Sequence, residues 1–256
     1  MKIVKTLVRK LDLNKGLVED VLDDVAVETP VKIYLNNEFY ATLMATPNQL
    51  KELAVGFLIG EALIKNMNEI KEVKIEDSSV KINLIEKKAV NHTRKLILTA
   101  CTSSEDFINQ LLNSETPIVE SNYKIKAFEA SEMMEECIKK AEFSRITGGV
   151  HFAGVFQDKE LKAFAEDVGR HNAMDKAIGL AALNNIKFQN SVLVSSGRQP
   201  ADMVLKAARA GLPILVSMRA PLLSGINVAK ALGVTLIGFA RKWRMNIYSF
   251  PERILI

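Results

Sequence analysis

One stretch, Thr147–Lys176, organises the chain; it reads TGGVHFAGVFQDKELKAFAEDVGRHNAMDK. Two short apolar runs in it, Val150–Phe156 and Leu161–Ala165, flank a polar turn and predict a β-hairpin. A helix is then predicted from Arg170, because apolar residues follow at helical spacing and Asp167 is suited to cap it. Charged and titratable side chains concentrate at this joint, which makes it a candidate site. For any one of them, a well-capped surface helix is the competing explanation.

From this joint onward, predicted helices and strands alternate. The helices are 170–183, 200–210 and 221–232, and the strands are 191–195, 213–217 and 234–239. Such alternation requires crossover connections between parallel neighbouring strands. With a further helix expected at 130–143, the second half is predicted to be a three-layer α/β/α sandwich.

The first half predicts a smaller α+β unit. Two extended runs, Val31–Leu35 and Phe39–Met44, are joined by two asparagines, which tolerate the positive φ of a tight hairpin turn. A helix should follow, with Thr46 as its cap. Gly56 and Gly60 lie within this helix and permit a neighbouring element to pack closely against it. We therefore expect an N-terminal α+β domain over 1–122 and an α/β/α domain over 123–256, with 1–27 as an irregular arm or a strand.

Composition narrows the class of protein. The chain has 256 residues, 48% of them hydrophobic and 25% charged, which is typical of a globular protein with a sizeable core. A net charge of +4 without an arginine-rich block argues against a nucleic-acid partner and suits a local basic pocket. Two cysteines are too few for a disulfide framework and indicate a reducing cytoplasm. The N-terminal segment does not resemble a signal peptide, and no apolar run is long enough to predict a membrane span.

Arginines recur at the carboxyl ends of the predicted parallel strands, where open α/β sheets bind ligands. Arg198 and Arg219 each precede a helix that begins with proline, and Arg241 and Arg244 follow the last of these strands. We expect the four to converge on one rim and bind phosphate, because guanidinium groups bind oxyanions bidentately. Trp243 is placed to stack on a planar base. Arginines are also common in solvated loops, but repetition at three joints favours a binding role.

Cysteine and histidine supply less chemistry. Cys101, in a polar loop, is a candidate nucleophile, although the residue by itself is better explained as an incidental exposed thiol. Cys137 lies among apolar residues of a predicted helix and is expected in the core. The three histidines are too widely spaced in sequence for a zinc motif, so we expect no protein-bound metal.

Several of these segments together resemble the FdhD/NarQ family. The matching motifs are Thr-Gly-Gly-Val-His (147–151), Glu-Asp-Val-Gly-Arg-His-Asn-Ala-Met-Asp-Lys (166–176), Ser-Gly-Arg (196–198), Ala-Val-Gly-Phe-Leu-Ile-Gly-Glu (54–61) and Gly-Phe-Ala-Arg (238–241). The similarity extends from about residue 28 to the C-terminus.

The resemblance implies a formate dehydrogenase accessory sulfurtransferase. Members of the family carry persulfide sulfur from a cysteine desulfurase to the bis-molybdopterin guanine dinucleotide form of the molybdenum cofactor. Their C-terminal domain is similar to the cytidine deaminase fold. A deaminase would carry a Cys-x-x-Cys zinc pair where this chain has Gln199-Pro200-Ala201-Asp202, so zinc-dependent deamination is not expected.

The resemblance also assigns residues. Cys101 matches the first cysteine of the family's sulfur-carrying Cys-x-x-Cys loop, and Ser104 replaces the second, which leaves a persulfide on a single cysteine. The cofactor-binding residues that it implies, together with those expected from the strand ends and the joint, are Phe239, Ala240, Arg241, Lys242, Trp243, Arg244, Arg198, Asp167 and His171.

Partners and alternatives follow from the same resemblance. The expected partners are a cysteine desulfurase, formate dehydrogenase and a second copy in a homodimer. The missing second cysteine keeps open a non-catalytic chaperone that binds the molybdenum cofactor. A zinc-free nucleotide-modifying enzyme of deaminase type is a third hypothesis.

Overall fold

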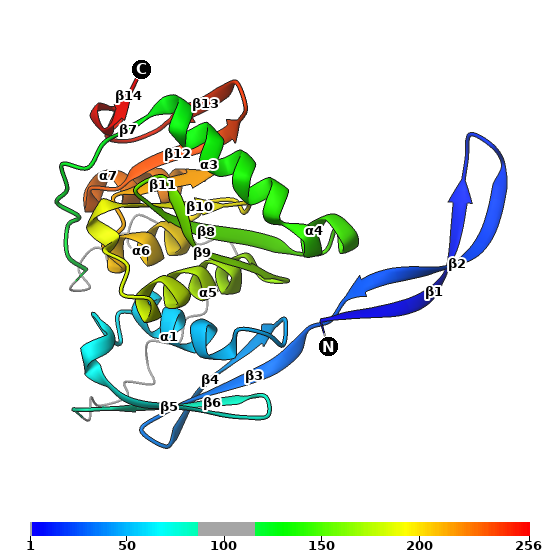
Figure 1. The fold of residues 1–256 in the computed structure, drawn as a ribbon, viewed down its shortest axis with the longest axis horizontal. Coiled ribbons are helices and arrows are strands. Elements are labelled where there is room, and N and C mark those ends of the chain that lie inside the picture. The colour runs from blue at the N-terminus through cyan, green and yellow to red at the C-terminus, as the bar shows by residue number, and fades with distance from the viewer. Residues whose placement is uncertain (1, 87–115) are drawn as a thin grey trace.

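A six-stranded sheet organises the C-terminal half of the computed structural model, which describes residues 2–86 and 116–256 (Figure 1). Its spatial order is β13-β12-β11-β10-β8-β9. The strands are β8 (His151–Gln157), β9 (Glu160–Asp167), β10 (Ser191–Ser195), β11 (Ile214–Ser217), β12 (Thr235–Arg241) and β13 (Arg244–Ile247). The central strands β10, β11 and β12 run parallel, as predicted, and β8, β9 and β13 are antiparallel to their neighbours.

Helices cover both faces of this sheet. One face packs against α3 (Ala127–Lys140), and the other against α5 (Arg170–Leu183), α6 (Ala201–Arg209) and α7 (Leu223–Leu232). Alternation along β10 shows the division: Val192 and Val194 belong to the cluster that includes Met134 of α3, and Leu193 belongs to the cluster on the other side. The C-terminal half therefore has three layers, with its sheet in the middle.

The helix predicted from Arg170 to Leu183 is confirmed at both ends, but two details differ from the prediction. Gly169, not Asp167, occupies the N-cap position of α5, and it makes no side-chain cap hydrogen bond. The helix expected at 130–143 is two helices, α3 and α4 (Glu142–Thr147). The helical path breaks at Ala141, whose ψ of 69° is not helical.

The N-terminal half contains a four-stranded sheet with the order β4-β3-β6-β5. Its strands are β3 (Thr29–Leu35), β4 (Glu38–Ala45), β5 (Ile70–Glu76) and β6 (Ser79–Leu84). Asn36 and Asn37 have φ values of 51° and 69°, which confirms the predicted tight turn. Helix α1 (Leu50–Gly60) begins after Gln49, so the prediction of Thr46 as its cap is wrong. The Thr46 hydroxyl instead accepts the Val168 N–H at 3.2 Å.

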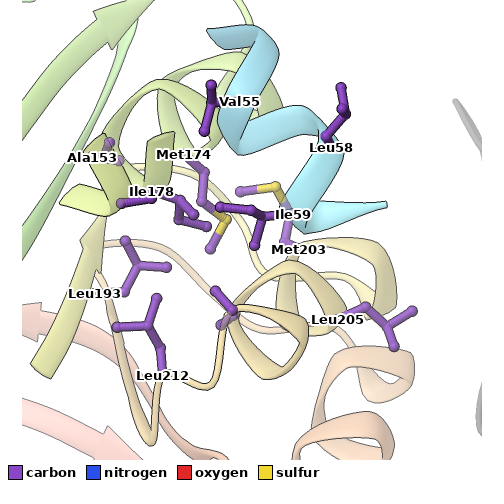
Figure 2. Packing of buried hydrophobic residues seen from close by; sticks show 14 of the residues in the cluster. Val55, Leu58, Ile59, Ala153, Met174, Ile178, Leu193, Met203, Leu205 and Leu212 are labelled. Atoms are coloured by element: carbon purple, nitrogen blue, oxygen red, sulfur yellow. The ribbon is translucent and has the colours of Figure 1, made fainter. Parts of the chain in front are cut away.

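Helix α1 packs directly on α5 through two glycines. A Cβ on Gly56 would lie 1.8 Å from the Asp175 carbonyl oxygen, and one on Gly179 would lie 1.9 Å from that of Glu52. Figure 2 shows Ile59 of α1 beside Met174 of α5 in this cluster. The cluster includes residues from both predicted domains. The boundary predicted near 122 therefore separates two sheets that share one hydrophobic core.

Several smaller elements complete the described chain. β1 (Ile3–Asp12) and β2 (Leu17–Ala26) form a hairpin that projects from the body (Figure 1). The remainder are β7 (Ile125–Lys126), which pairs with β14 (Ile254–Leu255), and the 3₁₀ turns η1 (Met67–Glu69), η3 (Phe188–Asn190) and η4 (Pro251–Arg253). Within the described ranges, none of the helices is long and apolar enough to cross a membrane. Cys101, Ser104 and the extended run expected at 95–100 lie outside those ranges.

Candidate anion-binding site

The carboxyl ends of β10 and β11 lie side by side, since Ser195 and Ser217 are partners in their parallel ladder. The loops that follow are joined by hydrogen bonds. The Ser217 hydroxyl donates to the Gly197 carbonyl at 2.7 Å, and the Gln199 N–H donates to the Ala220 carbonyl at 3.1 Å. These bonds hold together the two loops that carry Arg198 and Arg219.

Among the described residues, four basic side chains line a cavity of about 290 Å³ at this edge of the sheet: His151, Arg170, Arg198 and Arg219. Arg170 is the first residue of α5, and His151 is the first residue of β8. Gly197 leaves room for Arg170, because a Cβ on Gly197 would lie 2.9 Å from the Arg170 Cβ. The Arg170 Nε atom is buried and has no hydrogen-bond partner within residues 2–86 and 116–256. An unsatisfied buried donor in a basic cavity is chemically suited to an anionic ligand.

His151 contributes a neutral hydrogen-bond donor to this cavity. Burial lowers the pKa of its imidazole, and the positive charges of Arg170 and Arg219 lower it further. Its Nδ1 atom lies 3.2 Å from the Ser196 Oγ, which already accepts the Phe152 N–H at 2.9 Å. The Ser196 hydroxyl proton can therefore be donated to Nδ1, and this assignment leaves the proton of the neutral ring on Nε2. The positive charge of the cavity at neutral pH then comes from its arginines.

His171 and Asp202 form a pair near the cavity. His171 Nε2 lies 2.8 Å from Asp202 Oδ2, and both side chains are partly exposed. Burial works to raise the pKa of Asp202, but the hydrogen bond and charge of His171 lower it overall. His171 was among the predicted binding residues, whereas its partner was not. In the described part of the chain, neither residue belongs to the cavity lining.

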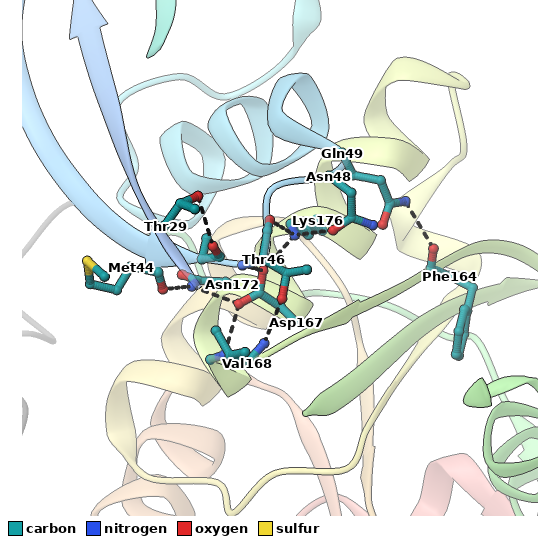
Figure 3. A network of polar contacts seen from close by, with 12 residues as sticks. Thr29, Met44, Thr46, Asn48, Gln49, Phe164, Asp167, Val168, Asn172 and Lys176 are labelled. Carbon is teal, nitrogen blue, oxygen red and sulfur yellow. Dashed lines mark hydrogen bonds and ion pairs between the residues drawn. The ribbon is translucent and has the colours of Figure 1, made fainter. Parts of the chain in front are cut away.

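Asp167 was also expected in the pocket, but the structure places its carboxylate in the interior (Figure 3). The side chains of Asp167 and Lys176 both have 0% exposure, and their oxygen and nitrogen atoms lie 2.6 Å apart. The same carboxylate accepts N–H groups of Thr46, Gly169 and Asn172 at 2.8–3.0 Å. Asp167 is therefore closed off from solvent and cannot contact a ligand in the cavity.

The arginines expected from the end of β12 do not join this cavity. Trp243 is 81% exposed, and Arg241, Lys242 and Arg244 are exposed with it in the turn between β12 and β13. The Ser131 hydroxyl of α3 holds this turn by donating to the Lys242 carbonyl at 2.9 Å. The predicted segment also includes Phe239, which is 37% exposed and has a φ of 54°, and Ala240, which is buried. Among the described residues, the cavity lining contains none of this segment.

His151 and Arg170 were therefore missing from the residues predicted to bind the ligand. A topological signal could have identified His151. Since β8 runs antiparallel to β10, its first residue lies at the edge where β10 ends. The described residues include no group of three or more His, Cys, Asp or Glu side chains placed to hold a metal ion.

Comparisons with known proteins agree with this fold. A sequence model of the FdhD/NarQ family matches residues 26–255. The sulfur carrier protein FdhD of Methanothermobacter thermautotrophicus is 36% identical over 246 residues, covering 95% of each chain. The sulfur carrier protein FdhD of Bacillus subtilis is 32% identical over 245 residues, covering 94% of each. A crystal structure of a protein from Desulfotalea psychrophila matches with a TM-score of 0.83 and 29% identity over 100% of both chains. The chain belongs to the FdhD/NarQ family.

Proposed function

We propose that this protein is a sulfur carrier required for formate dehydrogenase activity. It takes persulfide sulfur from a cysteine desulfurase and passes it to bis-molybdopterin guanine dinucleotide, which is its bound substrate. The general role is supported by the relatives named sulfur carrier protein FdhD, which align with more than nine-tenths of this chain. The proposed setting is the reducing cytoplasm, where a single thiol stays available for persulfide chemistry.

The observation that carries this proposal is the basic cavity. Dinucleotide substrates of this class carry pyrophosphate groups, and arginine side chains bind phosphate oxygens with paired, charge-assisted hydrogen bonds. Three arginines line the cavity, and the buried Nε of Arg170 lacks a partner among the described residues. We assign the phosphates to this cavity. The exposed Trp243 and its neighbours in the β12–β13 turn would contact the more distant nucleotide parts of the substrate.

Sulfur transfer would proceed through Cys101. Its thiolate attacks the terminal sulfur of a persulfide on the donor protein; a new S–S bond forms, the donor S–S bond breaks, and the donor leaves as a thiolate. Cys101 then carries one additional sulfur as a persulfide. The exchange needs no external oxidant, because the sulfur is already at the persulfide oxidation level on the donor. This assignment rests on the family resemblance, since Cys101 lies outside the described residues.

A second candidate function is a non-catalytic chaperone that holds the molybdenum cofactor. Ser104 favours it, because it stands where the resemblance places a second cysteine. Replacing Cys101 with serine separates the two functions. The sulfur-carrier proposal requires this variant to lose support of formate dehydrogenase, whereas a chaperone would keep it.

Mass spectrometry tests the sulfur step directly. After incubation with a cysteine desulfurase and cysteine, the wild-type protein should gain sulfur on Cys101. Cys137→Ser is a matched control, because burial in the core strongly raises the pKa of the Cys137 thiol and keeps it unreactive. Sulfur should be lost in Cys101→Ser and retained in Cys137→Ser. Absence of added sulfur on Cys101 in the wild-type protein would refute the persulfide step.

A further inference from the structure

We propose that the buried pair Asp167–Lys176, braced by Thr46, is a positioning device that sets Arg170 and His151 in the basic cavity. This inference rests on the proposed phosphate-binding role of that cavity. It gives Asp167 a role through other residues, in place of the direct ligand contact that its sequence context suggested.

The network joins two strand-to-helix connections that are far apart in sequence (Figure 3). One is the connection from β9 to α5, and the other leads from β4 to α1. Lys176 donates to the Thr46 carbonyl at 2.9 Å and to the Asn48 side-chain oxygen at 3.0 Å. The side chain of Asn172 donates to the Met44 carbonyl at 2.7 Å. The N-terminal half thereby holds the start of α5 from below.

The route from this network to Arg170 is short. Asp167 accepts the Gly169 N–H at 2.8 Å, and Thr46 accepts the N–H of Val168 at 3.2 Å. These bonds fix the two residues that immediately follow Asp167 and lead into α5. Gly169 has no side-chain cap of its own, so the network supplies the order that a cap would otherwise give. The Arg170 side chain then lies against Gly197, where it lines the cavity.

The route to His151 passes through the sheet. His151 and Asp167 are directly opposite each other in the antiparallel ladder of β8 and β9. Residues opposite each other in such a ladder have neighbouring backbones, so a shift at Asp167 is passed to the strand that carries His151. Two of the four described residues that line the cavity therefore lie close to the same buried carboxylate, His151 across the ladder and Arg170 three residues along the chain.

Stability alone is a weak explanation for this arrangement. The free-energy cost of removing two charges from water offsets much of their mutual attraction. A neutral pair of similar size often stabilises the fold equally well. A role in holding a binding side chain in its productive geometry does explain why such a pair is present despite its desolvation cost. The two charges here are fully buried. Their other hydrogen bonds go to the β9–α5 connection, which leads into Arg170, to Asn172 of α5 and to the β4–α1 connection.

The chain contains a matched control on the same helix. Asp175 lies next to Lys176 in sequence and pairs with Lys206 of α6 at 2.9 Å, with side-chain exposures of 2% and 6%. This second buried pair lies at the contact with α1, where Gly60 approaches Lys206. Lys206 also lies 3.3 Å from the partly exposed Glu61 carboxylate. The second pair therefore has the burial of the first and one additional acidic neighbour, and it does not adjoin the described cavity-lining residues.

The test is isothermal titration calorimetry with inorganic pyrophosphate on neutralised pairs. Asp167→Asn with Lys176→Met should bind about tenfold more weakly than the wild type, as expected for loss of groups that support a binding residue. Asp175→Asn with Lys206→Met should stay within about twofold of the wild type for the same reason. Affinities are calculated for the folded fraction, which circular dichroism reports.

A second pair of variants covers the case in which the first does not fold. Thr46→Ser keeps the oxygen that accepts the Val168 N–H and should bind normally, whereas Thr46→Val removes it and should bind several-fold more weakly. Equal affinities in Thr46→Val and the wild type would overturn the positioning role. If the wild type itself fails to bind pyrophosphate, the phosphate-binding assignment fails first, and the two failures are thereby distinguished.

Discussion

The ends of β10 and β11 differ from the end of β12, although all three strands run parallel and have arginines at or just beyond their ends. After β10 and β11 the chain turns over the sheet edge into a helix, and Arg198 and Arg219 meet in one cavity. After β12 it reverses into β13, and Arg241 and Arg244 remain exposed. The type of connection, more than the strand end itself, determines where the arginine lies.

The largest expected effect tests the first of these two regions. Arg198→Ala combined with Arg219→Ala removes two charge-assisted contacts, at about 1.5–3 kcal/mol each. Pyrophosphate binding should therefore fall by roughly 100-fold or more in calorimetry. A loss smaller than about threefold would show that the cavity does not hold the phosphates.

Glycine substitutions should give the next largest difference. Gly197→Ala places a Cβ 2.9 Å from the Arg170 Cβ and should displace that side chain, weakening pyrophosphate binding by about tenfold. Gly154→Ala is the matched change within β8, where the Cβ would lie 2.8 Å from the Cys137 Sγ of α3 and meets none of the cavity arginines. It should lower the melting temperature and leave affinity per folded molecule nearly unchanged. Equal losses of affinity in both variants would contradict the comparison.

A pH series examines His151. Because its pKa is lowered in the free protein, a bound anion should raise that pKa, and binding should take up a proton. Affinity should therefore increase as the pH falls below the ordinary histidine value of about 6.5. The measurement is the ratio of wild-type to His151→Gln affinity between about pH 7.5 and 5.5, which cancels protonation of pyrophosphate itself, and a rise of a few-fold is expected. A flat ratio would remove His151 from the site.

The smallest effect on pyrophosphate should come from the β12–β13 turn. Arg241→Ala with Arg244→Ala should change its affinity by no more than about twofold, because exposed charges are screened by solvent. The same variant should bind guanosine diphosphate distinctly more weakly, if this turn contacts the nucleotide as proposed. Parallel titrations with both probes check this, and a large loss for pyrophosphate would place the phosphates at the turn.

Local sequence patterns predicted the C-terminal elements well. β10 and α5 begin and end at the predicted residues, because an apolar run and an apolar helical face each reflect burial against neighbours. Long-range competition explains the failures. Thr46 and Asp167 have the right side chains for caps, but each is engaged across more than 120 residues by the other's strand-to-helix connection.

The residues of the candidate site divide in the same way, into those that local sequence patterns predict and those that depend on long-range contacts. Motif and strand-end reasoning identified Arg198 and Arg219, since both lie in loops directly after parallel strands. Arg170 and His151 required knowledge of the antiparallel position of β8 and of the space above Gly197. The pair His171–Asp202 likewise depends on two helices meeting, which no local pattern in the sequence records.

The most direct measurement is a crystal structure of the protein with guanosine diphosphate bound. The account predicts a phosphate within hydrogen-bond distance of the Arg170 Nε and of the Arg198 and Arg219 guanidinium groups. Phosphate density beside Arg241 and Arg244, with the cavity of Arg170 unchanged, would contradict it.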